Sequence, residues 1–87
     1  MTTVEIYTWQ YCPFCIRAKS LLNQKGVNYQ EYAIDGDEEA RMLMIERSNG
    51  RTTVPQIFIN DQGIGGCNEL YALEQVDKLN EMLGLSN

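Results

Sequence analysis

Near its start, the chain carries VEIYT at residues 4–8 and CPFC at residues 12–15. In the first segment, β-branched and aromatic residues alternate with polar ones, which predicts a β-strand. Pro13 suits the first turn of a helix, because its ring fixes φ and its missing N–H is not needed there. We therefore predict a strand that leads into a helix over 13–25, with Gly26 as the C-terminal cap.

The rest of the chain continues this alternation of strands and helices. We predict a second strand over 27–34, followed by a helix that has Asp37 as its N-cap and stops near Asn49-Gly50. A third strand over 56–60 then turns through a hairpin into a short strand at Ile64. A last helical region covers about 68–83. Whether Val76-Asp77 breaks that last region stays open. The first β-α-β unit implies a parallel pair with a right-handed crossover, and the hairpin adds antiparallel strands. The predicted fold is an α/β domain over residues 1–87, with a four-stranded mixed sheet and helices on both faces.

Apolar spacing identifies the helix faces that we expect to point to the core. The predicted core positions are Cys15, Ala18, Leu21 and Leu22 in the first helix, Ala40, Leu43 and Met44 in the second, and Leu70, Leu73, Leu79 and Met82 in the last region.

Composition excludes several classes of function. The chain has 87 residues, three cysteines, no histidine and a net charge of −5. An odd number of cysteines cannot form a fully paired disulfide framework. A structural zinc site needs four ligands, and only Cys67 is left besides the CPFC pair. The acidic balance argues against nucleic acid as a partner, so we expect no metal and no nucleic acid.

The N-terminal residues give an expectation about the compartment. The start of the chain has no cationic segment and no long apolar run, so it does not resemble a signal peptide. No apolar stretch approaches the ~20 residues of a membrane helix. We expect a cytosolic protein with no membrane partner. In a reducing compartment, cysteines are more often catalytic or metal-binding than structural.

The spacing of Cys12 and Cys15 predicts redox chemistry. One helical turn brings their Cα atoms to ~5–6 Å, within the range that a disulfide accepts. Cys12 precedes the helix, where free N–H groups and the positive end of the helix dipole favour a thiolate. Cys15 lies on the apolar face, so we predict that Cys12 attacks and Cys15 resolves the mixed disulfide. Two inert buried thiols are the alternative, but Cys12 is poorly placed for burial.

Three segments together resemble the glutaredoxin family. They are CPFC at residues 12–15 after its strand, TTVPQIFI at 52–59 and GGCNEL at 65–70, in the order that the family shows. Because it has the second cysteine, Cys15, the chain resembles the dithiol class of that family. The resemblance implies a thioredoxin-like fold, and a monomer that uses glutathione as co-substrate, with no tightly bound cofactor, to reduce disulfides and glutathionylated client proteins.

The resemblance also implies a glutathione site. Pro55 would be a cis proline facing the active site, and the Val54 backbone would pair with the cysteinyl part of glutathione, as in strand addition. Gly66, Cys67 and Asn68 would offer backbone N–H groups to the γ-glutamyl carboxylate. The full expected set is Phe14, Arg51, Thr53, Val54, Pro55, Gly66, Cys67 and Asn68.

Binding an anionic tripeptide to an acidic protein must rest on local donors. Arg51, directly before the TTVP segment, is the predicted cationic partner of the glycyl carboxylate, with Arg17 and Arg47 as weaker alternatives. The sequence also departs from the family pattern. Trp9 stands where many glutaredoxins carry lysine, Asn68 stands where aspartate is common, and Phe14 replaces the usual tyrosine.

Some alternatives stay open. Cys67 is either a small semi-buried residue whose backbone contacts glutathione or a third redox thiol. Tyr7, Trp9 and Tyr11 are expected in core packing and active-site lining. Two rival functions are a redoxin that takes electrons from a flavin reductase and a dimer that shares a [2Fe–2S] cluster through Cys12.

Overall fold

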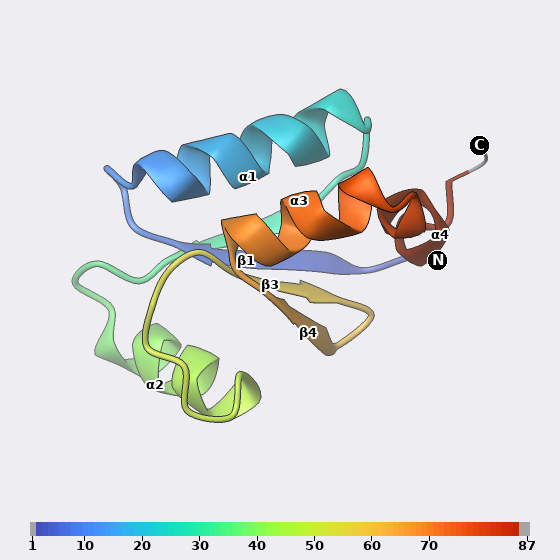
Figure 1. Cartoon of the computed structure of the whole chain (residues 1–87). Helices are drawn as coiled ribbons and strands as arrows, with labels where there is room; N and C mark the ends of the chain where they lie inside the picture. Colours follow the sequence, from blue (N-terminus) through green and yellow to red (C-terminus); the bar gives the residue numbers. More distant parts are fainter. Residues whose placement is uncertain (1, 86–87) are drawn as a thin grey trace.

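A four-stranded mixed sheet forms the centre of the molecule (Figure 1). The computed structural model describes residues 2–85. The strands are β1 (Val4–Thr8), β2 (Gln30–Ala33), β3 (Gln56–Ile59) and β4 (Gln62–Gly65), in the spatial order β2-β1-β3-β4. β1 pairs parallel with β2, and the other two pairings are antiparallel. This arrangement confirms the predicted mixed sheet.

Helices cover both faces of the sheet, as predicted. α1 (Pro13–Gln24) and α3 (Cys67–Gln75) lie on one face and α2 (Glu38–Arg47) lies on the other, while α4 (Lys78–Leu83) follows α3 (Figure 1). Strand alternation therefore creates two cores. Ile6 and Leu22 belong to the core under α1 and α3, whereas Tyr7 and Phe58 belong to the core above α2.

The second strand is shorter than the predicted segment 27–34. The Val27 N–H still bonds to the carbonyl of Leu22, at 3.4 Å, so the chain is completing the turn that ends α1. The ladder with β1 begins only at Gln30, which faces Glu5. The C-terminal turn of the helix therefore competes with the sheet for these backbone groups.

The last helical region is broken, which answers the question that the sequence left open. Asp77 has φ of 60°, in the left-handed region, so the backbone changes direction between α3 and α4. The region also begins one residue earlier than predicted, at Cys67. Leu73 and Met82 pack against the core only partly buried, whereas Leu70 and Leu79 are buried.

Leu43 was predicted in the core, and that prediction is wrong. Its side chain is 49% exposed, and Met44 is the one residue of α2 that is fully buried. The face toward the sheet carries Ala40, Met44 and then Arg47, whose guanidinium lies 4.1 Å from the ring centre of Phe58. Arg47 therefore covers aromatic surface in the core, and Leu43 points past it to solvent.

Helix length also bears on membranes. Within residues 2–85, no helix is both long enough and apolar enough to cross a bilayer.

Candidate active site

Cys12 is the N-cap of α1. Its backbone is extended, with φ of −122° and ψ of 110°, and its Sγ accepts a hydrogen bond from the Cys15 N–H at 3.3 Å. Pro13 occupies the first helical turn and needs no donor partner there. The sulfur of Cys12 thus lies among the donors of the helix start, where negative charge is stabilised.

Cys12 is more buried than the sequence suggested. We expected it to be poorly placed for burial, but only 7% of the residue is exposed. The reason is the loop before β3, since the Cys12 Sγ lies 3.9 Å from the carbonyl oxygen of Val54. A substrate sulfur that reaches Cys12 therefore also meets the Val54 backbone.

Cys15 lies deeper and is held as a thiol. It is fully buried on the inner face of α1, beside the core. The pKa of Cys15 is raised to about 12, chiefly by burial and to a smaller extent by the neighbouring Cys12. A buried, protonated Cys15 cannot attack an external disulfide, whereas Cys12 retains some exposure. This difference supports the predicted division of roles.

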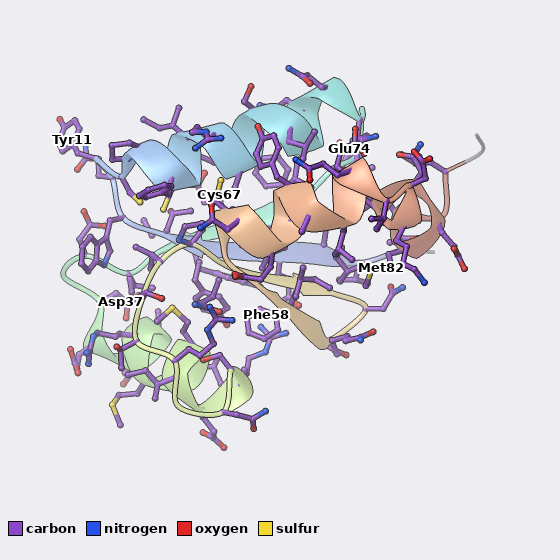
Figure 2. All side chains as sticks on the ribbon, in the orientation of Figure 1. Tyr11, Asp37, Phe58, Cys67, Glu74 and Met82 are labelled. Carbon is purple, nitrogen blue, oxygen red and sulfur yellow. The ribbon has the colours of Figure 1, made fainter. Side chains whose placement is uncertain are left out.

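The eight residues expected to bind glutathione come together around one pocket. The pocket is lined by Phe14, Arg51, Thr53, Val54, Pro55, Gly66, Cys67, Asn68 and Glu69. They come from the start of α1, the loop before β3 and the start of α3, and Figure 2 shows Cys67 at this end of α3. Segments far apart in sequence therefore meet directly beside Cys12.

The Val54–Pro55 peptide bond is cis, as the resemblance implied. Within residues 2–85, the Val54 N–H has no hydrogen-bond partner, and its carbonyl oxygen faces the Cys12 sulfur. Val54 therefore presents both a backbone donor and a backbone acceptor at the pocket.

Glu69 is the lining residue that the sequence reasoning missed. Its Oε1 accepts a hydrogen bond from the Gly66 N–H and lies 3.5 Å from Nη2 of Arg51. The spacing of Gly66 and Glu69 is that of a capping box, which was the available signal. The Gly66 N–H, expected to bind a carboxylate of glutathione, is thus already engaged. The first-turn N–H groups of Cys67 and Asn68 remain for an anionic ligand.

Two of the three candidate arginines do not line the pocket. Arg47 forms an ion pair with Glu5 at 2.9 Å and donates to the Tyr7 hydroxyl, on the α2 side of the sheet. Arg17 lies over the ring of Tyr71, 5.2 Å from its centre. Of the three candidate arginines, Arg51 is therefore the one that lines the pocket, and it is the one that the sequence analysis preferred.

The aromatic residues before Cys12 divide into three environments. Tyr7 is buried in the core, Trp9 is 48% exposed and Tyr11 is 86% exposed. Figure 2 shows Tyr11 projecting outward from the loop before α1. The burial of Tyr7 agrees with the expected core packing. Trp9 and Tyr11 do not line the pocket, whereas Phe14 does.

Cys67 is buried, with 4% exposure, at the start of α3. Burial raises its pKa, which disfavours its thiolate. All three cysteines are free thiols in this structure. Among residues 2–85, no three Cys, Asp or Glu side chains gather in a way that could hold a metal ion.

The comparison with protein families identifies this arrangement. The glutaredoxin family model matches residues 4–64. The chain belongs to the glutaredoxin family. It is 64% identical to a probable glutaredoxin of Synechocystis over 92% of this chain and 73% of the relative. It is 58% identical to glutaredoxin 3 of Escherichia coli, over 95% of this chain and 99% of that protein.

Solved glutaredoxins share the fold. The solution structure of glutaredoxin from Brucella melitensis superposes with a TM-score of 0.82 at 48% identity, covering 95% of this chain and 89% of that one. The crystal structure of the buckwheat glutaredoxin–glutathione complex has a TM-score of 0.86 at 29% identity, covering 95% and 77% of the two chains. The thioredoxin-like fold expected from the three motifs is confirmed.

Proposed function

We propose that this glutaredoxin uses Cys12 and Cys15 to reduce protein disulfides and glutathionylated thiols, with glutathione as the reductant. As a member of its family, the chain is a thiol-disulfide oxidoreductase. The observation that carries the proposal is the position of the Cys12 sulfur, which caps α1 and faces Val54. This sulfur lies at the edge of a pocket whose N–H groups can donate hydrogen bonds to an anionic ligand.

The reaction begins when the Cys12 thiolate attacks one sulfur of a client disulfide. A bond forms between Cys12 and that sulfur, and the other client sulfur leaves as a thiolate that takes up a proton. Cys15 then loses its proton and attacks Cys12, which forms the Cys12–Cys15 disulfide and releases the second client thiol. The client gains two electrons, and the cysteine pair loses them.

Two glutathione molecules return these electrons. The first attacks Cys12, so that Cys15 leaves as a thiol and Cys12 carries glutathione in a mixed disulfide. The second attacks that glutathione sulfur, which releases glutathione disulfide and restores the Cys12 thiolate. A glutathionylated client needs only this last half of the cycle, because Cys12 takes the glutathione from it directly.

The timing of the Cys15 proton follows from its surroundings. Burial is the main cause of its raised pKa, and the hydrogen bond and charge of Cys12 add to it. When the Cys12 sulfur enters a mixed disulfide, its charge is lost, and these two contributions are removed. Cys15 therefore becomes easier to deprotonate at the stage where it must act as nucleophile.

The pocket supports glutathione as the reductant. The Val54 N–H and C=O suit the cysteinyl backbone, the first amides of α3 suit the γ-glutamyl carboxylate, and Arg51 suits the glycyl carboxylate. Phe14, half exposed at the rim, supplies apolar surface. We further propose that the protein acts in the cytosol as a monomer and holds no tightly bound cofactor.

Single cysteine variants test the proposal. Cys12→Ser should lose glutathione-disulfide exchange with every substrate, because the attacking sulfur is gone. Cys15→Ser should retain reduction of a glutathionylated peptide but lose reduction of a protein disulfide. Substantial activity in Cys12→Ser would overturn the proposal, as would regeneration by a flavin reductase with no response to glutathione.

A further inference from the structure

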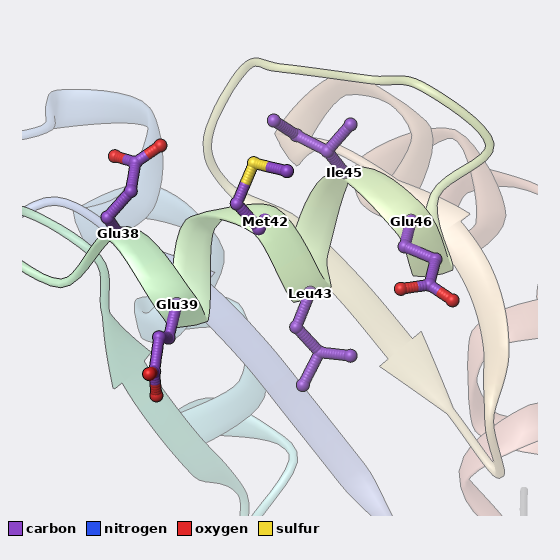
Figure 3. Close-up of a pocket in the computed structure, with 6 residues that line it drawn as sticks. All are labelled: Glu38, Glu39, Met42, Leu43, Ile45 and Glu46. Carbon is purple, nitrogen blue, oxygen red and sulfur yellow. The ribbon is translucent and has the colours of Figure 1, made fainter.

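α2 presents a shallow groove along its exposed side, which we call the α2 groove. It is lined by Glu38, Glu39, Met42, Leu43, Ile45 and Glu46. Figure 3 shows Glu39 and Leu43 extending to one side of the helix, and Glu38, Met42 and Ile45 extending to the other. The two rows repeat one pattern, in which an acidic residue is followed one turn later by an apolar one.

Ile45 packs partly against the core above α2, whereas Met42 and Leu43 belong to neither core. Met42 is 57% exposed and Leu43 is 49% exposed, on a helix whose inner face buries Met44. Burying an exposed aliphatic side chain against a partner removes apolar surface from water, which favours association. Neighbouring exposed side chains of this kind are typical of an interaction surface.

The charges around these residues are mainly acidic, with three glutamates and Arg41 on the exposed part of α2. Arg41 pairs with Glu38 at 3.5 Å, and Arg47 is turned inward to Glu5. Among the described residues 2–85, Glu39 and Glu46 take part in no ion pair. A partner that covers Met42 and Leu43 therefore meets two glutamates that are free to bind cations.

This sign decides between the possible occupants. A second copy of the chain would place glutamates against glutamates, and like charges at close range oppose association. Anionic lipids would be repelled in the same way. A segment with lysine or arginine around an aliphatic anchor matches both the charge and the apolar surface.

The groove is connected to the active-site loop. The Gln10 N–H, two residues before Cys12, bonds to the Asp35 carboxylate at 3.2 Å. Asp35 belongs to the turn that leads into α2, whose first residue is Glu38. A partner docked along α2 therefore extends from the neighbourhood of the loop that carries the reactive sulfur.

We propose that the α2 groove docks a basic segment with apolar anchors on the proteins that this glutaredoxin reduces. This inference rests on the proposed function, since it names the chemistry of the client. The pocket beside Cys12 shares no lining residue with the α2 groove, and it offers Arg51 and the first amides of α3 to an anionic ligand. The two surfaces would thus separate the small anionic reductant from the basic part of the client.

A binding experiment tests the groove without any redox step. The probe is a fluorescein-labelled 14-residue peptide of Lys, Leu and Ala with leucines at helical spacing, and a second peptide carries Glu in place of every Lys. We expect the basic peptide to bind at least tenfold more tightly, with an affinity that falls as salt is raised from 50 to 200 mM. Amide shifts in ¹⁵N spectra should map to α2. Equal binding of both peptides, or shifts that map elsewhere, would overturn the proposal.

A matched pair of substitutions controls for net charge. Glu39→Lys and Glu81→Lys each reverse one exposed glutamate in the first turn of a helix, but Glu81 lies in α4. Glu39→Lys should weaken binding of the basic peptide about fivefold or more, while Glu81→Lys should change that affinity less than twofold. Leu43→Ser tests the apolar part and should weaken binding similarly. An equal loss in Glu81→Lys would show a general charge effect and refute the groove.

A kinetic experiment separates this proposal from the proposed function. Two glutathionylated peptides share one cysteine-containing sequence, and only one carries the basic Lys/Leu segment. We expect a higher kcat/KM for the basic peptide and loss of that preference in Glu39→Lys, with turnover of the plain peptide unchanged. No turnover of either peptide would refute the proposed function, whereas equal turnover of both would refute the docking groove alone.

Discussion

The guanidinium of Arg51 and the carboxylate of Glu69 meet in the pocket beside Cys12, with 3.5 Å between Nη2 and Oε1. The same carboxylate oxygen accepts the Gly66 N–H, so Glu69 joins the start of α3 to the loop before β3. Gly65 allows this approach, because a Cβ at that position would lie 2.8 Å from Arg51 Nη1 and from the Glu69 carboxylate. The position of Arg51, the one cation that lines the pocket among residues 2–85, is therefore set by an acidic neighbour.

Replacing Arg51 should weaken glutathione binding with little effect on the chemical step. In Arg51→Gln, the KM for glutathione should rise roughly 3- to 10-fold at nearly constant kcat, because a half-exposed, charge-assisted contact contributes about 1 kcal/mol. Steady-state kinetics with a glutathionylated peptide measure this. The effect should shrink in high salt.

Arg41→Gln is the matched control for that prediction. Arg41 also pairs with a glutamate at 3.5 Å, but it lies on α2 away from the pocket. Both substitutions remove one positive charge, so they change the net charge equally. A similar rise in KM for Arg41→Gln would mean that the overall field, and not Arg51, determines glutathione binding.

Glu69 should stabilise the fold in a pH-dependent manner. The Gly66 N–H lowers the pKa of Glu69 below its ordinary value of 4.5. A lowered pKa in the folded state gives stability that is present above the unfolded value and lost as pH falls through the folded value. At pH 7 the free energy of unfolding of the wild-type protein should exceed that of Glu69→Gln by about 0.5 kcal/mol, a small value because the side chain is half exposed. Urea unfolding at pH 7, 5, 4 and 3 should show this difference disappearing; a difference that grows toward pH 3 contradicts it.

Arg47 should matter for stability and not for glutathione. Its side chain is 20% exposed, pairs with a Glu5 side chain that is 14% exposed, and covers Phe58. Arg47→Met should lower the free energy of unfolding by about 2 kcal/mol, less than the loss of a fully buried partner, and leave the KM for glutathione unchanged. It should also raise the pKa of Glu5, which Arg47 holds low. Urea unfolding is the measurement, and Arg41→Met, expected to cost under about 0.5 kcal/mol, is its control.

Cys15 should stay unreactive toward alkylation far into alkaline pH. Burial is the largest cause of its pKa of about 12, and this cause persists when Cys12 is replaced. In Cys12→Ser protein, iodoacetamide should label Cys15 only above about pH 10, as followed by peptide mass mapping. Half-maximal labelling near the ordinary thiol pKa of about 8.5 would show that Cys15 is not shielded.

The sequence predicted the parts of the fold that depend on local chemistry. The strand before Cys12, the proline at the start of α1 and the cap at Asp37 all rest on properties of a few adjacent residues, and each is present. The position of Leu43 could not be predicted in this way. An arginine covers the core surface that the apolar pattern assigned to leucine, because Arg47 has both Glu5 and Phe58 as partners. Neither partner is adjacent to it in sequence.

The site shows the same limit. Short motifs placed the cysteine pair, the Thr-Val-Pro segment and the start of α3, and the fold brings them to one pocket. The contacts between these segments were not predictable, since the shielding of Cys12 by Val54 and the contact of Glu69 with Arg51 depend on packing between distant segments. Burial of Cys12 was missed for this reason.

The hydrogen bond from the Cys15 N–H to the Cys12 sulfur links catalysis to folding. The atom that forms and breaks bonds with substrate is also the cap of a helix, so each change at that sulfur alters the free energy of the folded state. A thermodynamic cycle then equates the difference in unfolding free energy between the dithiol and disulfide forms with a shift in reduction potential, about 30 mV for each 1.4 kcal/mol. The electrochemistry of the protein is therefore adjustable through the first turn of α1, with both cysteines left in place.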